Sequence, residues 1–308
     1  MLWIILALIL LAAAAYLMYY GYKLAFYYSD PQAPAMEYNA DDQCAPCKGV
    51  LDPAIIAFDS QPCERVSIRS RDGLTLQGRY YHSADGAPLH ILCHGYKGNA
   101  IRDFCGGWKV AAELGHNALL IDQRCHGKSQ GHTITFGIRE KTDVLEWIRY
   151  ANGRFGNVPI VLSGVSMGAA TVLMAAGMEL PENVKAVVAD CPYDAPSNII
   201  RKVLGQDMGM PEKMVYPLIR LGGMVYGGFN LDADSPVEAV KRSRVPILLI
   251  HGDEDRFVPY AMSQNIHAAA PEKIRFVTVP GAGHALNFAT NPQLYSQTLK
   301  TFLSEHLQ

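Results

Sequence analysis

Residues 158–176 read VPIVLSGVSMGAATVLMAA and combine two kinds of element. The first part, VPIVLS, is short, apolar and partly β-branched, which predicts a buried strand. The last part, GAATVLMAA, predicts a helix, because alanine, leucine and methionine favour helical backbone. The turn that joins them is Gly164-Val165-Ser166-Met167-Gly168. Its two glycines allow a very tight turn, which exposes the Ser166 hydroxyl beside a helix N-terminus, where negative charge is favoured.

Strands and helices alternate along the chain from residue 64 onward. We predict strands over residues 64–70, 74–81, 89–93, 117–121, 158–162, 184–189, 245–250 and 274–279, and helices over residues 102–114, 138–151, 169–176 and 291–307. Most of these strands are short and almost entirely apolar, which is typical of a parallel sheet with helices on both faces. The first two flank the hairpin signal Arg71-Asp72-Gly73 and add an antiparallel edge. The sequence therefore predicts the α/β class.

The two partners that a nucleophilic serine needs follow it in the order acid, then histidine. Asp255 lies in the turn HGDEDRFVP, directly after a predicted strand, and His284 lies in the glycine-rich turn PGAGHA, after the last one. Because parallel strands end at one edge of the sheet, we expect Ser166, Asp255 and His284 to meet there. Asp253 and Glu254 lie nearer the strand end, and we interpret them as turn caps or as support for the acid.

A further glycine-rich turn, residues 94–99 (HGYKGN), follows the predicted strand LHILC. An oxyanion is stabilised by two backbone N–H groups that point at one oxygen. We expect the N–H groups of Tyr96 and Met167 to supply them, because Met167 directly follows the serine. His90 and His94 lie on one strand roughly 13 Å apart and so cannot share a metal. We predict no metal and no cofactor.

Together these motifs resemble the serine hydrolases of the α/β-hydrolase superfamily, above all its membrane-anchored bacterial esterases and lysophospholipase-like members. The turn DQRCHGKS, residues 122–129, is similar to theirs, although members usually carry glycine in place of Cys125. The resemblance implies the α/β-hydrolase fold, with Ser166 as nucleophile, His284 as base and Asp255 as the acid that orients it. It further implies a small-molecule carboxylic ester or thioester as substrate, cleaved through an acyl-enzyme intermediate. The apolar lid segment and the N-terminal apolar segment described below favour a lipid or fatty-acyl ester.

Two alternatives use the same fold. A serine peptidase or amidase would need the same three residues, but such enzymes commonly carry an extra domain that gates peptides. A non-catalytic binding protein normally lacks one of the three residues, whereas all three are present here. Labelling by an active-serine probe separates the enzymes from the binding protein.

The segment 192–235 is longer than a simple crossover and is rich in methionine and aromatic residues. We expect a small helical lid there, in which flexible methionine side chains suit an adaptable acyl pocket. Gly222-Gly223 and Gly227-Gly228 are candidate hinges. Packing of the insertion on the core accounts for this composition equally well.

The N-terminal segment 2–22 holds 21 residues without a charge. About 20 apolar residues suffice to cross the hydrocarbon core of a bilayer. Trp3 at one end and four tyrosines at the other suit the two interfacial belts. A cleaved signal peptide is disfavoured, because no lysine or arginine precedes the apolar run. We therefore predict a single-pass anchor over 1–28, a linker or stalk over 29–63 with a short helix around residues 53–58, and a catalytic domain over 64–308.

Charge and cysteine usage bear on location and partners. Lys23 favours a body on the cytoplasmic side, whereas Cys44 and Cys47 suit a disulfide in an exported body, so the side of the membrane stays open. Seven cysteines are an odd number, which excludes a complete disulfide framework. With 27 Lys and Arg against 29 Asp and Glu, the net charge of −2 gives no basis for binding nucleic acid.

Overall fold

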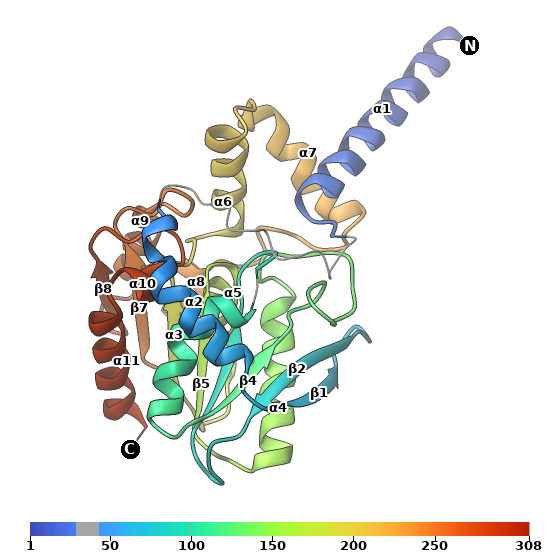
Figure 1. Cartoon of the computed structure of the whole chain (residues 1–308). Coiled ribbons are helices and arrows are strands. Elements are labelled where there is room, and N and C mark those ends of the chain that lie inside the picture. The colour runs from blue at the N-terminus through green and yellow to red at the C-terminus, as the bar shows by residue number, and fades with distance from the viewer. Residues whose placement is uncertain (29–42, 99, 308) are drawn as a thin grey trace.

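A twisted sheet runs through the centre of the molecule in the computed structural model (Figure 1). The structure describes residues 1–28, 43–98 and 100–307, and in this part of the chain the sheet has eight strands in the order β1-β2-β4-β3-β5-β6-β7-β8. They are β1 (Glu64–Arg69), β2 (Thr75–Tyr81), β3 (Leu89–Cys93), β4 (Asn117–Ile121), β5 (Ile160–Val165), β6 (Val184–Asp190), β7 (Ile247–Gly252) and β8 (Ile274–Val279).

The direction of the strands follows the sequence pattern. β1 pairs antiparallel with β2, and β2 pairs antiparallel with β4. The remaining pairs, in the order β4-β3-β5-β6-β7-β8, are all parallel. Every residue of β3, β4, β5 and β7 is buried, which explains their continuous apolar runs. The predicted mostly parallel sheet with an antiparallel edge is confirmed.

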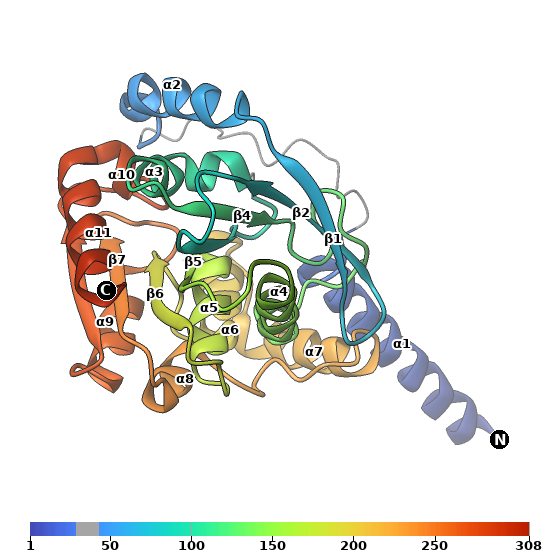
Figure 2. The ribbon, with the colours of Figure 1, turned by 90° about the horizontal axis from the view of Figure 1, so that it is seen from below.

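Helices cover both faces of the sheet (Figure 2). One face carries α3 (Ala100–Glu113), α10 (Asn287–Thr290) and α11 (Pro292–His306), and the other carries α4 (Glu140–Phe155), α5 (Met167–Ala176), α8 (Pro236–Arg242) and α9 (Tyr260–Ala269). Alternate residues of β5 face the two layers: Leu162 packs in the core with α4 and α5, and Val161 in the core with α3 and α11. Because helices cover both faces, only the ends of the central strands lie within reach of solvent and substrate.

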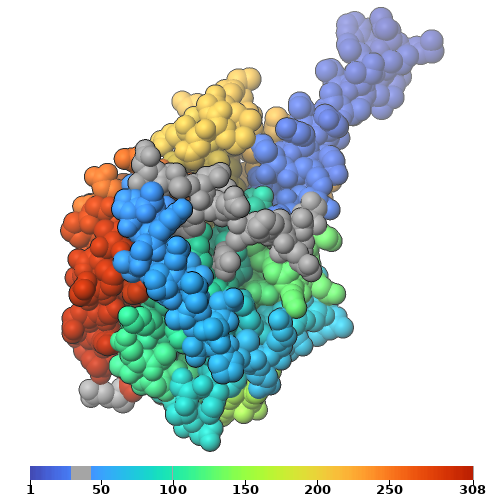
Figure 3. All heavy atoms as spheres, viewed as in Figure 1, coloured from blue at the N-terminus to red at the C-terminus, as the bar shows by residue number. Residues whose placement is uncertain are grey.

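The lid segment, residues 192–235, forms α6 (Pro196–Lys202), a π-type turn η2 (Val203–Asp207) and α7 (Glu212–Val225). These elements rise beyond one edge of the sheet, at the end of the molecule where α1 (Leu2–Ala25) also lies (Figures 1 and 3). Within the described chain, α1 is the one helix long and apolar enough to cross a membrane, by length and composition.

The structure revises the predicted linker over 29–63: the short helix expected around residues 53–58 is present, but it is longer and packed. Residues 29–42 lie outside the described residues, but the part that follows is not a free stalk: it forms η1 (Ala45–Cys47) and α2 (Lys48–Asp59), and α2 packs against α3. Leu51 and Phe58 of α2 are buried, and the ring of Phe58 stacks on Trp108 at 4.6 Å. Leu51, Ile55 and Phe58 recur at helical spacing, which gives α2 an apolar face that the Pro- and Asp-rich composition conceals.

Candidate active site

The turn at Ser166 has the backbone that the sequence motif requires. Ser166 has φ 55° and ψ −116°, a conformation that a residue with a Cβ adopts only under local strain. A Cβ on Gly168 would lie 1.8 Å from the carbonyl oxygen of Cys93, and one on Gly164 would lie 2.2 Å from the oxygen of Gly168. Strand β3, strand β5 and helix α5 therefore come together only because both positions are glycine.

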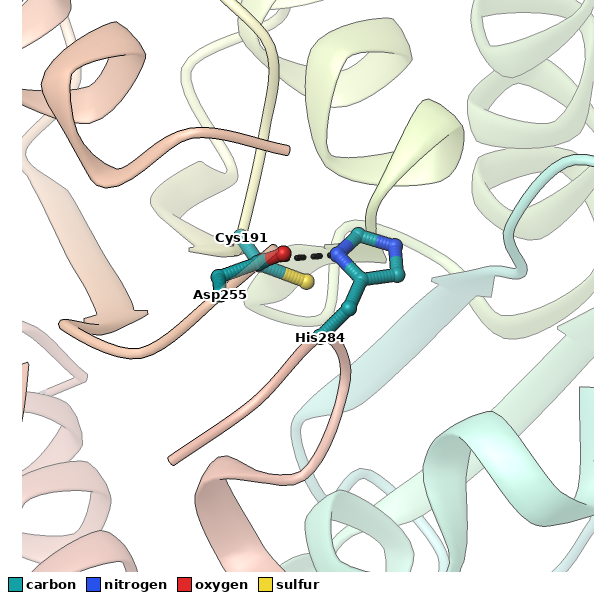
Figure 4. Close-up of side chains that lie close together, drawn as sticks. All are labelled: Cys191, Asp255 and His284. Carbon is teal, nitrogen blue, oxygen red and sulfur yellow. Dashed lines mark hydrogen bonds and ion pairs between the residues drawn. The ribbon is translucent and has the colours of Figure 1, made fainter. Parts of the chain in front are cut away.

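His284 links Ser166 to Asp255. Its Nε2 lies 2.9 Å from the Ser166 Oγ, and its Nδ1 lies 2.7 Å from an Asp255 carboxylate oxygen. Figure 4 shows the second of these contacts. Because a carboxylate only accepts, Nδ1 carries the proton and donates it, and Nε2 is left to accept from the hydroxyl. The loops that follow β5, β7 and β8 thus bring together the three residues that the sequence analysis selected.

Asp255 is buried and fully hydrogen-bonded. One carboxylate oxygen accepts from the N–H groups of Phe257 at 2.9 Å and Val258 at 2.8 Å, and the other faces His284 and also Nε2 of His251 at 3.0 Å. Burial opposes ionisation, but the charge of His284 and the hydrogen bonds from His251 and His284 outweigh it and lower the pKa of Asp255. Asp255 therefore stays a carboxylate.

The loop after β3 lies directly against the serine, since a Cβ on Gly95 would contact the Ser166 Cβ at 3.4 Å. The amides around Tyr96 are already used: Gly95 N–H donates to Asp103 at 2.8 Å, and Lys97 N–H donates to Nε2 of His126 at 2.9 Å. Among the described residues, no group accepts from the Tyr96 N–H. Met167 is the first residue of α5, so its N–H stands at the helix N-terminus beside the serine.

Buried side chains of the loop after β4 support the loop after β3. Burial lowers the pKa of His126 to about 3, so its ring is neutral, with Nδ1 donating to the Arg124 carbonyl at 2.8 Å and Nε2 accepting from Lys97. The neighbouring Cys125 has φ 69°, in the left-handed region that favours glycine. A glycine at this position would adopt the same backbone without a steric cost.

A cavity of about 250 Å³ opens at Ser166. Apart from the serine hydroxyl, its wall is dominated by apolar and aromatic side chains from the loops after β3, β4 and β7, from the start of α5, from the lid segment and, unexpectedly, from α1. They are Leu24, Ala25, Tyr96, Phe136, Met167, Tyr193, Ile199, Ile200, Val203, Leu204, Met208, Ile219, Phe257 and Val258. In the lid segment, Met208 and Ile219 line the cavity, although Met208 is also partly exposed, whereas Met214 and Met224 are exposed and do not line it.

Comparison with known proteins assigns the family. Residues 91–298 match the model of the alpha/beta hydrolase family. The chain belongs to this family. A similar relative of this hydrolase is the uncharacterized protein YqkD of Bacillus subtilis, 24% identical over 80% of this chain and 81% of YqkD. A monoacylglycerol lipase of Mycolicibacterium smegmatis is 26% identical over 72% of this chain and 90% of the lipase. The solved esterase Pf2001 of Pyrococcus furiosus shares the fold, with TM-score 0.66 and 19% identity over 81% of this chain and 93% of that one.

In this hydrolase, His251 is a site residue that the sequence analysis missed. It is fully buried; its Nε2 faces Asp255 and also the Val258 carbonyl at 3.0 Å, and its Nδ1 lies 2.6 Å from the Ser263 hydroxyl. Two acceptors at Nε2 place the ring proton there, so His251 donates to the same Asp255 oxygen that faces His284 and holds it in place. Its position at the end of a strand of otherwise apolar residues, four before the acid, is the signal that could have found it.

Cys191 also lies beside the acid and the base of this hydrolase (Figure 4). Its sulfur and the ligand atoms of Asp255 and His284 lie within 4.8 Å of one another, close enough to hold a metal ion. Burial, together with the charges of Asp190 and Asp255, raises the pKa of the Cys191 thiol well above its usual value. A thiol that stays protonated is a poor ligand, so we interpret Cys191 as a packing residue of the hydrolase site.

Asp190 gives the hydrolase an unusual pH dependence of stability. It is buried at the end of β6, accepts from Asn287 Nδ2 at 2.6 Å, and has its pKa raised to about 6 by burial. The folded state therefore holds a proton that the unfolded chain releases near pH 4, and stability falls as pH rises between those values.

Asp190→Asn removes this pH-dependent loss of stability, because the amide is neutral at every pH and no charge is buried. We expect the free energy of unfolding of the variant, relative to the unsubstituted protein, to rise by about 1–2 kcal/mol from pH 5 to pH 8. Denaturant unfolding of the full chain in one detergent at both pH values measures it. If the variant and the unsubstituted protein differed in free energy of unfolding by the same amount at both pH values, the raised pKa of Asp190 would be contradicted.

Proposed function

We propose that this chain is a serine hydrolase that cleaves carboxylic esters, with Ser166 as nucleophile, His284 as general base and Asp255 as the acid that orients it. The observation that carries the proposal is the pair of hydrogen bonds through His284, which joins the serine hydroxyl at 2.9 Å to the carboxylate at 2.7 Å. A hydroxyl in this setting can be deprotonated as it attacks.

The reaction proceeds in two halves. Ser166 Oγ attacks the ester carbonyl carbon while His284 Nε2 takes the hydroxyl proton, and the imidazolium then gives that proton to the leaving alcohol. The serine is left acylated. Water next attacks the acyl carbon and passes a proton to His284, which returns it to Ser166 Oγ as the carboxylic acid leaves. Asp255 keeps the Nδ1 tautomer in both halves and stabilises the imidazolium.

The N–H groups of Tyr96 and Met167 are the proposed oxyanion donors. The first comes from a loop whose neighbouring amides are held by Asp103 and His126, and the second from the start of α5. Donors fixed before the reaction need no reorganisation when the negative charge develops on the carbonyl oxygen.

The cavity at Ser166 is lined by apolar side chains, which favours binding of the apolar acyl group of the substrate there. Its volume of about 250 Å³ is a little below the range of about 300–1,000 Å³ of pockets for drug-sized ligands, which suits one acyl chain. The names of the similar proteins agree with such substrates, since they include an esterase and a monoacylglycerol lipase. We propose acyl esters, with lipid esters and thioesters included.

We also propose that α1 stays in the mature protein as a single-pass membrane anchor. A signal sequence is removed, and its removal here would take Leu24 and Ala25 out of the cavity wall. The first part of the helix is exposed and apolar, as a span in lipid requires, whereas Gly21, Tyr22 and Phe26 are buried in the body.

The full chain, purified in detergent, should release p-nitrophenol from esters of acyl chains between acetate and palmitate and should react with a fluorophosphonate probe. We expect turnover that depends on chain length, because the acyl group must fill an apolar wall. Cleavage of p-nitroanilides with no cleavage of esters would favour a peptidase or amidase. Failure of both turnover and labelling would favour a binding protein.

A further inference from the structure

The end of α1 packs closely against α7 of the lid segment, and both views show the two helices side by side (Figures 1 and 2). A Cβ on Gly222 would lie 2.2 Å from the carbonyl oxygen of Met18, and one on Gly21 would lie 3.1 Å from the Ile219 side chain. The Tyr226 hydroxyl donates to the Ala15 carbonyl at 3.0 Å. One glycine on each helix therefore lets the two backbones approach to contact distance.

The same end of α1 is also fixed to the body below the lid. The Tyr22 hydroxyl lies 2.6 Å from the Thr133 hydroxyl, and the Phe26 carbonyl accepts from Ile134 N–H at 2.8 Å. Phe26 is 1% exposed, with its ring edge-on to Phe229 at 5.0 Å. The helix is thus held from both the lid segment and the body, so its last turn has one fixed position.

That last turn lines the cavity. Leu24 and Ala25 share the wall with Ser166 and with Ile219, which is also the α7 residue in contact with Gly21. Tyr96, whose N–H is one of the proposed oxyanion donors, directs its hydroxyl at the Ala25 carbonyl. Contacts from the proposed anchor therefore reach the atoms around the reacting group.

We propose that the last turn of α1 determines which acyl chains the enzyme accepts, with Leu24 and Ala25 as specificity-determining residues. The substrates are then esters of a single linear acyl chain whose length is limited by this turn. This inference rests on the proposed ester hydrolysis and adds to it a selectivity wall that comes from outside the hydrolase domain.

The test compares chain-length profiles of the full chain in one detergent, with kcat/KM measured for p-nitrophenyl butyrate and palmitate. Ala25→Leu fills part of the cavity and should lower the palmitate-to-butyrate ratio of kcat/KM about tenfold or more, since one methylene in an apolar pocket changes it by about 10–200-fold. Leu24→Ala enlarges the cavity and should raise that ratio. The matched control is Ala13→Leu, the same substitution in the exposed part of α1, and it should leave the ratio unchanged.

Labelling by the fluorophosphonate probe separates this inference from the proposed function. Variants that react with the probe as fast as the unsubstituted protein, but whose palmitate-to-butyrate ratios of kcat/KM are shifted, support the proposed role of the last turn of α1. Ratios within about twofold of the unsubstituted protein for both Leu24→Ala and Ala25→Leu would overturn it, while ester hydrolysis itself would stand. If Ala25→Leu fails to fold, the direction of the Leu24→Ala shift decides alone. An unsubstituted chain that cleaves no ester would overturn the proposed function and this inference together.

Discussion

Ser166→Ala is expected to lower kcat for ester hydrolysis by about 10⁶-fold, the scale on which serine hydrolases lose activity without their nucleophile. Among the described residues, the other nucleophilic group near His284 is the Cys191 thiol, which lies beside Asp255 and stays protonated. The backbone strain at position 166 is the same for both residues, because alanine also carries a Cβ. The variant should therefore fold normally and fail to react with the fluorophosphonate probe.

The control is Ser163→Ala, which makes the same change three residues earlier, on β5. Ser163 is buried, but it borders a different small cavity together with His90 and Leu92. We expect it to retain turnover within about threefold. Turnover and labelling by Ser166→Ala at levels close to those of the Ser163 variant would refute the assignment of the nucleophile.

Asp255→Asn is expected to lower kcat by about 10⁴-fold, with a smaller effect on KM, because an amide cannot satisfy the donors around it. One carboxylate oxygen accepts from Phe257 and Val258 N–H groups, and the other accepts from both His251 and His284. An amide oxygen can replace only one of these oxygens, and the NH₂ group then faces two other donors. His284 would turn away or take the wrong tautomer.

The matched control is Asp253→Asn, two residues earlier in the same turn. Its carboxylate accepts from Gly281 N–H at 2.7 Å, a role that an amide oxygen can fill. Initial rates with p-nitrophenyl butyrate give the comparison. We expect the Asp253 variant to keep activity within about threefold. If the losses at positions 253 and 255 were equal, the acid would have been misassigned.

The sequence predicts the centre of this molecule better than its margins, and the reason is physical. The proximity of Ser166, Asp255 and His284 can be predicted because each residue follows an apolar strand, and the parallel strands all end at one edge of the sheet. The structure adds the lengths of the two hydrogen bonds through His284. Local motifs and the order of the strands are enough to identify the loops that meet at the site.

The margins depend on tertiary contacts that no local pattern encodes. The sequence predicts a short helix around residues 53–58 within a linker, whereas α2 covers Lys48–Asp59 and packs against α3, a contact that no local pattern encodes. Gly21 and Gly222 contribute to one interface although they lie far apart in the chain, and each alone suggests only a flexible point. His251 resembles any histidine at a strand end until its contact with Asp255 is known.

The close packing of α1 on the body fixes how far the reacting serine stands from a bilayer. α1 has 24 residues, but Ala15, Met18 and Gly21 already contact α7 or its C-terminal cap, so only residues 2–14, about 20 Å of helix, extend free of the body. This is shorter than the hydrocarbon thickness of about 30 Å, so a spanning α1 brings α7 to the bilayer surface and leaves no spacer between lipid and enzyme. With α1 in a bilayer, the cavity lies at the level of the headgroups. The rate would then follow the mole fraction of substrate among the surrounding lipids, and not its concentration in the surrounding water.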